Sequence, residues 1–320
     1  GVDASLGGSG SKSTQQGQNG GAAGAAGTDA QNKPSSTTSG AMSASGNYAK
    51  GNSTTAEAGS ITAGRNLSIH SGGDAAFEGT NIAAGGNGSI STGGNLTFSA
   101  AHSTSSDTAI GGHLSADGSS SRTGSNANGA ANNASGQKPA DADSSSSGKF
   151  NAGAKYSNGS SNTAAAGAIV TGGKLNIQAG KNASFEGTDI AAGGDARIAA
   201  KGDLHFNAAN NTSNDRAVGV DVSGGASSSQ KPGSTGTDGA KGSAPSSSNS
   251  KEGKLSVNYS QGSSKTAKAG SISSGGNLQL VSGGDTTLEG TQVAADGKAA
   301  INAGGSIHVT AVENKTSNLS

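Results

Sequence analysis

The chain has 320 residues, 57 of them glycine, with no cysteine or tryptophan, and its 21 basic residues balance its 21 acidic residues. Hydrophobic residues make up 30% of the chain and aromatic residues 2%, too little for an ordinary globular core. This composition excludes a disulfide scaffold, a thiolate site and a nucleic-acid binder with a basic face. Two alternatives remain: a disordered chain, or a repeat whose few apolar residues recur at fixed intervals.

The first elements in chain order are two predicted strands on either side of a low-complexity loop at about 9–40, which we expect to be mobile and solvent-exposed. Each strand alternates apolar or small residues with polar ones, at Val2/Ala4/Leu6 and at Met42/Ala44/Gly46/Tyr48. No signal peptide and no run of 18 apolar residues is present, and the chain opens on Gly1 without Met. We therefore expect no membrane-spanning segment and interpret the chain as a piece of a longer protein.

From Ile61 onward, apolar residues recur every 21 residues, so that Ile61, Ile69 and Phe77 are followed by Ile82, Ile90 and Phe98. Each unit contains three pairs spaced by two, which places both side chains of a pair on one face of a strand. Gly and Asn between the pairs suit sharp corners. Three strands and three corners predict one triangular coil of a right-handed parallel β-helix, an all-β solenoid with 21-residue coils and Ser/Gly-rich extruded loops.

A single coil is too small to fold alone. It buries about four sizeable side chains, at roughly 1.5–3 kcal/mol each, whereas ordering its backbone costs roughly 20–40 kcal/mol. Stacked coils, about 4.8 Å apart, supply the missing hydrogen bonds and apolar cover. The interior columns predicted in this way contain Ile61, Leu67, Ile69, Phe77, Ile82, Ile90, Leu96, Phe98, Ile169, Leu175, Ile177, Phe185, Ile190, Ile198, Leu204, Phe206, Ile272, Leu278, Leu280, Leu288, Val293, Ile301, Ile307 and Val309.

A longer period interrupts the coils with inserts. The sequence Phe-Glu-Gly-Thr at 77–80 recurs at 185–188 and, with Leu first, at 288–291. Each insert has an outgoing strand, a loop (about 117–148 and 224–250) and a returning strand, which form either two further coils or a hairpin. We favour further coils, because two coils and a loop together fit the length of an insert. The outgoing and returning strands are Ile110/Gly112/Leu114, Val218/Val220/Val222, Phe150/Ala152/Ala154/Tyr156 and Leu255/Val257/Tyr259.

These periods divide the chain into coil pairs and inserts. We expect three segments of two coils each, at 58–101, 166–209 and 269–312. The inserts occupy 1–57, 102–165 and 210–268, and 313–320 begins the next one.

The blocks SITAGRNLSIHSGGDAAFEGTNIAAGG and SISSGGNLQLVSGGDTTLEGTQVAADG resemble the haemagglutinin repeats of filamentous-haemagglutinin-type exoproteins of two-partner secretion systems. Their alternation with SGNYAKGNSTTAEAGSI and Ser-rich segments is similar to the second repeat region of contact-dependent growth inhibition exoproteins of the CdiA type. The resemblance implies a β-helical filament that is secreted through an outer-membrane partner and displayed on a Gram-negative cell surface. In the toxin-delivery members it also implies association with the target cell's outer membrane and toxin translocation.

No residue pattern predicts a catalytic, cofactor-binding or metal site. We expect His70, His205 and His308 to point outward, since each follows an inward column residue. Glu78, Glu186 and Glu289 recur at one corner, either as an acidic contact for a ligand or cation or as a charge that prevents mis-stacking. Another corner series can form hydrogen bonds along the stack, and it lacks the nine-residue repeat of calcium-binding β-helices. The members of this series are Asp74, Asn95, Asn182, Asp203, Asp285 and Ser306.

The functional hypotheses are accordingly non-enzymatic, and no cofactor, small-molecule ligand or nucleic acid is expected. The first is a repeat segment that acts in contact-dependent growth inhibition, with a target-cell outer membrane or surface receptor as partner. The alternatives are an adhesin or haemagglutinin stalk for host or cell–cell attachment, and a passive spacer. A β-helical enzyme acting on polysaccharide would need clustered acids and bases, and none is visible. We expect a polar surface with no aromatic patch.

Overall fold

The computed structural model describes residues 2–15, 35–123, 143–233 and 243–320. Over these residues the chain is built from β-strands and contains no helix. Short strands of four or five residues form three six-stranded parallel sheets, and long strands form the greater part of one seven-stranded antiparallel sheet. The chain is thus an all-β protein that combines a parallel β-helix with an antiparallel sheet.

The β-helix has six coils, each made of three short strands, one from each parallel sheet. In every sheet the strand order follows the chain order of the coils. The strands are β3 (Ser60–Ala63), β4 (Leu67–Ser71) and β5 (Ala75–Glu78) in the first coil; β6 (Asn81–Ala84), β7 (Gly88–Thr92) and β8 (Leu96–Ser99) in the second; β11 (Ala168–Thr171), β12 (Leu175–Ala179) and β13 (Ala183–Glu186) in the third; β14 (Asp189–Ala192), β15 (Ala196–Ala200) and β16 (Leu204–Asn207) in the fourth; β19 (Ser271–Ser274), β20 (Leu278–Ser282) and β21 (Thr286–Glu289) in the fifth; and β22 (Gln292–Ala295), β23 (Ala299–Ala303) and β24 (Ile307–Thr310) in the sixth.

The pairing register follows the 21-residue period. Ile82 of β6 pairs with Ile61 in the preceding coil and with Ile169 in the following one. The second contact joins coils that are separated by an entire insert, yet like residues still meet. The inserts therefore interrupt the chain without changing the register of the stack.

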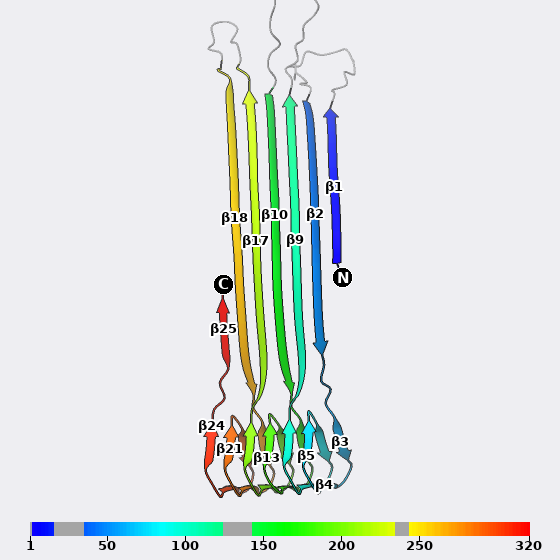
Figure 1. Cartoon of the computed structure of the whole chain (residues 1–320), viewed down its shortest axis with the longest axis vertical. Helices are drawn as coiled ribbons and strands as arrows, with labels where there is room; N and C mark the ends of the chain where they lie inside the picture. The colour runs from blue at the N-terminus through cyan, green and yellow to red at the C-terminus, as the bar shows by residue number, and fades with distance from the viewer. Residues whose placement is uncertain (1, 16–34, 124–142, 234–242) are drawn as a thin grey trace, which may run out of the picture. The chain divides into compact units, whose positions relative to one another are not determined.

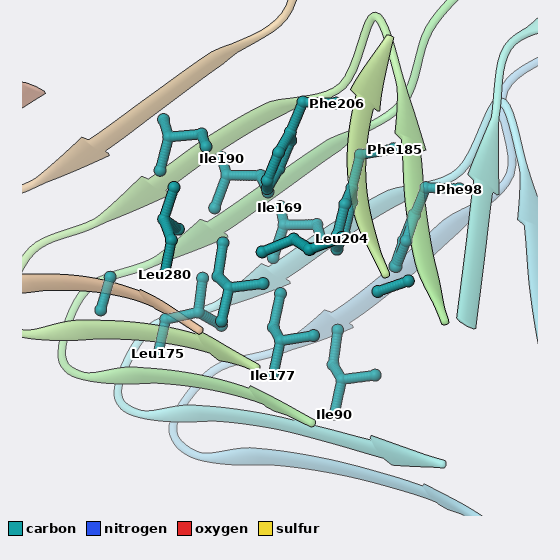
Figure 2. Packing of buried hydrophobic residues seen from close by; sticks show 14 of the residues in the cluster. Ile90, Phe98, Ile169, Leu175, Ile177, Phe185, Ile190, Leu204, Phe206 and Leu280 are labelled. Atoms are coloured by element: carbon teal, nitrogen blue, oxygen red, sulfur yellow. The ribbon is translucent and has the colours of Figure 1, made fainter. Parts of the chain in front are cut away.

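Large apolar side chains fill the interior of the middle coils. Phe98, Phe185 and Phe206 are at most 2% exposed, and their rings stack in sequence, as Figure 2 shows. Isoleucine columns run beside them, with Ile90 next to Ile177 in the close-up. The continuous core contains Ile82, Ile90, Leu96, Phe98, Ile169, Leu175, Ile177, Phe185, Ile190, Ile198, Leu204, Phe206, Ile272, Leu278, Leu280 and Leu288.

Polar residues at interior positions form hydrogen bonds to backbone or to each other. The Thr171 hydroxyl donates to the carbonyl of Gly173, and the Ser274 hydroxyl donates to that of Gly194. The hydroxyls of Thr286 and Ser282 lie 2.8 Å apart. Because each buried hydroxyl has a partner, these substitutions in the columns avoid the cost of an unsatisfied polar group.

The two end coils are less well covered than the middle ones. Ile61, Leu67, Ile69, Phe77, Val293 and Ile301 are partly buried and pack against the core. Ile307 and Val309, which the column pattern places in the interior, are instead 48% and 70% exposed. The reason is that β24 has β21 on one side and no described strand stacked on the other.

The expectation that each insert forms two further coils is wrong. The inserts form long antiparallel strands that lie side by side (Figure 1) in the order β1-β2-β9-β10-β17-β18-β25. The longest of them continue without the corners that divide every coil into three short strands, so their backbone partners come from neighbouring long strands instead. The strands are β1 (Val2–Gln15), β2 (Ser35–Thr54), β9 (Ala101–Thr123), β10 (Asp143–Ala165), β17 (Ala209–Lys231), β18 (Ser246–Lys268) and the short β25 (Lys315–Leu319).

The long strands also extend into segments expected to be loops. The flanks of all three predicted loops, at 9–15, 35–40, 117–123, 143–148, 224–231 and 246–250, are strand. Serine hydroxyls, which the composition associates with loops, pair across these strands. The remaining parts of the predicted loops at 16–34, 124–142 and 234–242 lie outside the described residues.

The contacts divide the chain into two compact units. One unit comprises Gly1–Lys50, Ala109–Ser157 and Ala217–Tyr259, and its described residues belong mainly to those parts of the long strands that are more distant in sequence from the coils. The other comprises Gly51–Thr108, Asn158–Arg216 and Ser260–Ser320, and contains all six coils. We refer to them as the sheet unit and the coil unit.

Candidate interaction surface

The recurring Glu-Gly-Thr corners are turns that connect one coil directly to the next. Their glycines, Gly79, Gly187 and Gly290, have φ values of 54°, 58° and 61°, a region that residues with a Cβ rarely adopt. The following threonine closes each turn, since its hydroxyl donates to the glutamate carbonyl at 3.0–3.3 Å. The motif therefore recurs in every second coil because only those coils continue without an insert.

The glutamates of these turns do not gather into a site. Their neighbours in the stack are Ser99, Asn207 and Thr310, so no two of them are adjacent. Glu186 Oε2 accepts a hydrogen bond of 3.2 Å from the backbone N–H of Ala100, where the chain leaves the second coil. Glu186 thus has a structural role, since its side chain holds the backbone at the point where an insert begins.

The Asp and Asn corner series forms a ladder along the coils. The side-chain oxygen of each residue accepts the backbone N–H of its equivalent in the next coil, from Asp74 through Asn95, Asn182, Asp203 and Asp285 to Ser306, with N···O distances of 2.6–3.2 Å. These bonds satisfy corner N–H groups that no strand pairs. One oxygen of each of these side chains is therefore engaged in a contact between coils.

A second ladder, which was not among the sequence-based predictions, runs along another corner. Asn66 accepts from Asn87 N–H and Asn87 accepts from Lys174 N–H, at 2.8 Å in both cases. Further along, Asp195 accepts the backbone N–H of Asn277, and the Lys174 ammonium lies 2.9 Å from its other oxygen. The hydrogen bond from Asn277 N–H, followed by the contact with Lys174, lowers the pKa of Asp195 below 3.8. This ladder could have been predicted from the sequence, because an Asn or Asp directly precedes the second apolar pair in most coils.

The histidines are dispersed over the surface. His70 and His308 are exposed and His205 is half-buried, and His70 Nδ1 lies 2.8 Å from the Ser91 hydroxyl of the next coil. No group of three or more His, Asp or Glu side chains within the described ranges could hold a metal ion. Nor do those ranges contain a helix capable of crossing a membrane.

The feature that stands out is an apolar face on the sheet unit. Large apolar side chains project from five neighbouring strands, and each is at least one-third exposed, with values from 36% for Val220 to 67% for Leu255. We call this set the apolar band. Its members are Met42 and Tyr48 on β2, Ile110 and Leu114 on β9, Phe150 and Tyr156 on β10, Val220 and Val222 on β17, and Leu255, Val257 and Tyr259 on β18.

The register of the long strands aligns the band in rows. Side-chain hydrogen bonds of 2.7–2.8 Å join the serine pairs 119/147, 146/228 and 227/250, and Gly111 lies opposite Asn47. With this register one row across the five strands reads Tyr48, Ile110, Tyr156, Val218 and Tyr259. The next row reads Gly46, Gly112, Ala154, Val220 and Val257, and the third reads Ala44, Leu114, Ala152, Val222 and Leu255.

The opposite face of the same strands is polar. It presents Asn47, Asn151, Lys155 and Asn258 as exposed side chains, and His113 Nε2 lies 3.9 Å from Asp221 Oδ1 across it. Because side chains alternate between the two faces of a strand, the period-two pattern of the inserts separates apolar from polar residues completely in this region. The sheet unit is therefore amphipathic.

The expected polar surface without an aromatic patch is thus wrong. The period-two residues of the inserts were visible in the sequence, but they belong to strands that lie far apart in the chain. Only the sheet brings Tyr48, Tyr156 and Tyr259 into a single row. Farther along the same unit, a polar hollow of about 390 Å³ is lined by hydroxyl side chains that include Thr38, Ser120 and Ser228 together with Arg122.

Comparison with known proteins identifies the repeat. A protein-family model described as hemagglutinin repeat matches residues 7–113, 103–222 and 149–320. The chain belongs to the hemagglutinin repeat family. The overlapping matches each contain coils and at least one long strand, as expected if the coil pair with its insert is the repeating unit. Searches of curated proteins and of solved structures found no match.

Membership of this family indicates the kind of protein in which the repeats occur. Hemagglutinin repeats are structural, adhesin-type repeats rather than enzymes, and they belong to large secreted filamentous exoproteins of the cell surface. Their general context is two-partner secretion. The coils of this chain agree with a filament, since each coil presents a surface on which the next one stacks.

Proposed function

We propose that this chain is a repeat segment of a Gram-negative exoprotein that acts in contact-dependent growth inhibition, delivering toxin to neighbouring bacteria. The observation that carries the proposal is the regular alternation of coil pairs with long hairpins. A plain stalk needs only coils, whereas here each pair of coils adjoins, in the chain, long strands that present an amphipathic face. The partner is the target cell's outer membrane or a receptor on it.

Export through an outer-membrane partner protein suits this composition. The chain contains no cysteine and few bulky side chains, so it can pass unfolded through a narrow pore. Each coil contacts mainly its neighbours in the stack, so folding can proceed outside the cell by local addition of coils. These properties support secretion and surface display.

The first experiment is binding of the labelled, folded chain to Gram-negative bacteria and, in parallel, to epithelial cells. Saturable binding to bacteria is expected. Binding to epithelial cells alone would favour a host adhesin, and binding to neither by a chain with intact β-structure would favour a spacer. Far-UV circular dichroism checks that the chain is folded in each case.

A deletion separates delivery from spacing. Removing residues 61–168 takes out the first two coils and the β9–β10 hairpin and joins two segments of the same repeat phase. A passive spacer would keep its function in the parent exoprotein after this change. A delivery role for this region predicts loss of growth inhibition of neighbouring cells while the shortened protein is still secreted.

A further inference from the structure

The apolar band exposes more apolar surface than a single soluble chain ordinarily does. Its side chains together expose on the order of 1,000 Å², whereas the largest apolar patch on a typical monomer covers about 300–600 Å². A sheet with one apolar face is ordinarily covered by a second layer. Over the described residues no helix or further strand of the sheet unit lies on this face. A partner molecule with a complementary apolar face would supply this second layer.

We propose that a second copy of this chain covers the apolar band, so that two sheet units pack face to face as a β-sandwich. The exposed area agrees with the roughly 800 Å² that each partner buries in an interface of standard size. In such a pair the same patch serves both partners, so charges within it would repel their own copies. The band and the small residues between its members contain no charged residue.

The sizes of the side chains in the apolar band also suit packing against a second sheet. The row that contains Tyr48, Tyr156 and Tyr259 carries large side chains, and the adjoining row begins with the small residues Gly46, Gly112 and Ala154. Sheets that pack face to face lie about 10 Å apart with their side chains interdigitated. Large side chains of one copy can therefore pack over the small residues of the other.

The dimensions of the band favour a protein partner over lipid. From Met42 to Tyr48 the band spans three steps of two residues, or about 20 Å. Strands that cross a bilayer carry an apolar belt of about 25 Å with aromatic residues at both borders. Here the tyrosines form a row along one border only, and Phe150 is the single aromatic residue near the other.

Sedimentation velocity of the full chain over a wide dilution series tests the proposal. We expect a species of twice the 30.0 kDa chain mass that dissociates on dilution. Val257→Asp should weaken the dimer by on the order of a hundredfold or more, because a charge without a partner would be buried in the interface. The matched control is Asn258→Asp, which adds the same charge to the next residue on the polar face and should leave the dimer intact.

Both variants should fold, because Val257 is 63% exposed in the single chain and Asn258 is exposed; far-UV circular dichroism verifies this. An apolar dye gives a second measurement, since dilution of the wild-type chain should uncover the band and increase fluorescence. A wild-type chain that stays at 30.0 kDa at every concentration would overturn the proposal, as would equal behaviour of the two variants.

A vesicle arm tests lipid as the occupant. The chain is mixed with phosphatidylethanolamine/phosphatidylglycerol vesicles and subjected to flotation. A monomer that floats with the vesicles, and no longer does so as Val257→Asp, would show that lipid covers the band and would overturn the dimer. The proposed function is tested separately, because a dimer that binds no bacteria would uphold this inference and contradict that proposal.

Discussion

Replacing Phe185 with alanine removes a central ring of the phenylalanine stack. The Phe185 side chain is 1% exposed, and its ring centroid lies 5.3 Å from that of Phe98 and 4.8 Å from that of Phe206. Both faces of the ring are covered, so a cavity would remain between two rigid coils. We expect the substitution to lower the local free energy of unfolding by about 3–5 kcal/mol.

Hydrogen exchange measured by mass spectrometry is the suitable assay, because repeat proteins open locally and each coil contacts mainly its neighbours. Amides of the third coil and of the coils on either side should exchange roughly a hundredfold faster or more, since each 1.4 kcal/mol corresponds to a factor of ten. Amides of the sheet unit should change little, because no residue of that unit belongs to the core cluster that contains Phe185.

Phe77→Ala is the matched control at the end of the stack. Phe77 is only partly buried and has one ring neighbour, Phe98, at 4.6 Å. With one face covered, its loss should cost about half as much, roughly 2 kcal/mol. If Phe77→Ala and Phe185→Ala accelerate exchange equally in their own coils, coverage of the rings does not determine their contribution and the reasoning is refuted.

Three further predictions concern the corners. Gly187→Ala should destabilise the coils by about 1–3 kcal/mol in urea unfolding, because φ is 58° and a Cβ would lie 2.9 Å from a neighbouring alanine; Gly64→Ala, with open space at that position, should be nearly neutral. Asn182→Ala should cost about 1 kcal/mol in the same assay through a lost ladder hydrogen bond, whereas the corresponding Asp variant should retain it. Because folding lowers the pKa of Asp195, the contribution of its carboxylate to stability is complete above pH 3.8. This contribution is lost as the pH falls through the pKa of Asp195 in the folded state. Asp195→Asn removes the ion pair with Lys174, so its melting temperature should lie below that of the wild type at pH 6 and approach it at lower pH; a constant difference would contradict this assignment.

The coil stack could be read from the sequence because its contacts are periodic. Parallel pairing places residue i against its equivalent in the next coil, so a column of like residues such as Phe77, Phe98, Phe185 and Phe206 appears as a fixed interval in the chain. The three polar residues in the columns did not disturb the pattern, since each hydroxyl has a hydrogen-bond partner. The pattern did not indicate how far neighbouring strands cover each end coil. Ile307 and Val309 are exposed because their strand lies at the end of the stack.

Only part of the candidate surface could be predicted from the sequence. Val220 and Val257 could be assigned to period-two strands, because alternation shows that one face is apolar. Alternation alone does not say whether such strands turn at corners into further coils or continue as hairpins. That choice depends on uninterrupted backbone pairing between neighbouring inserts, which is a property of the assembled sheet.

The sequence by itself determined the 21-residue coil, its register and the columns of the stacked core, apart from the exposure of Ile307 and Val309 at its end, because each of these follows from a local interval repeated along the chain. Only the tertiary structure decided that the inserts are antiparallel hairpins and that Tyr48, Tyr156 and Tyr259 share one row. The physical reason is that antiparallel register depends on the sum of two residue numbers rather than on a constant difference. No interval in the chain records it.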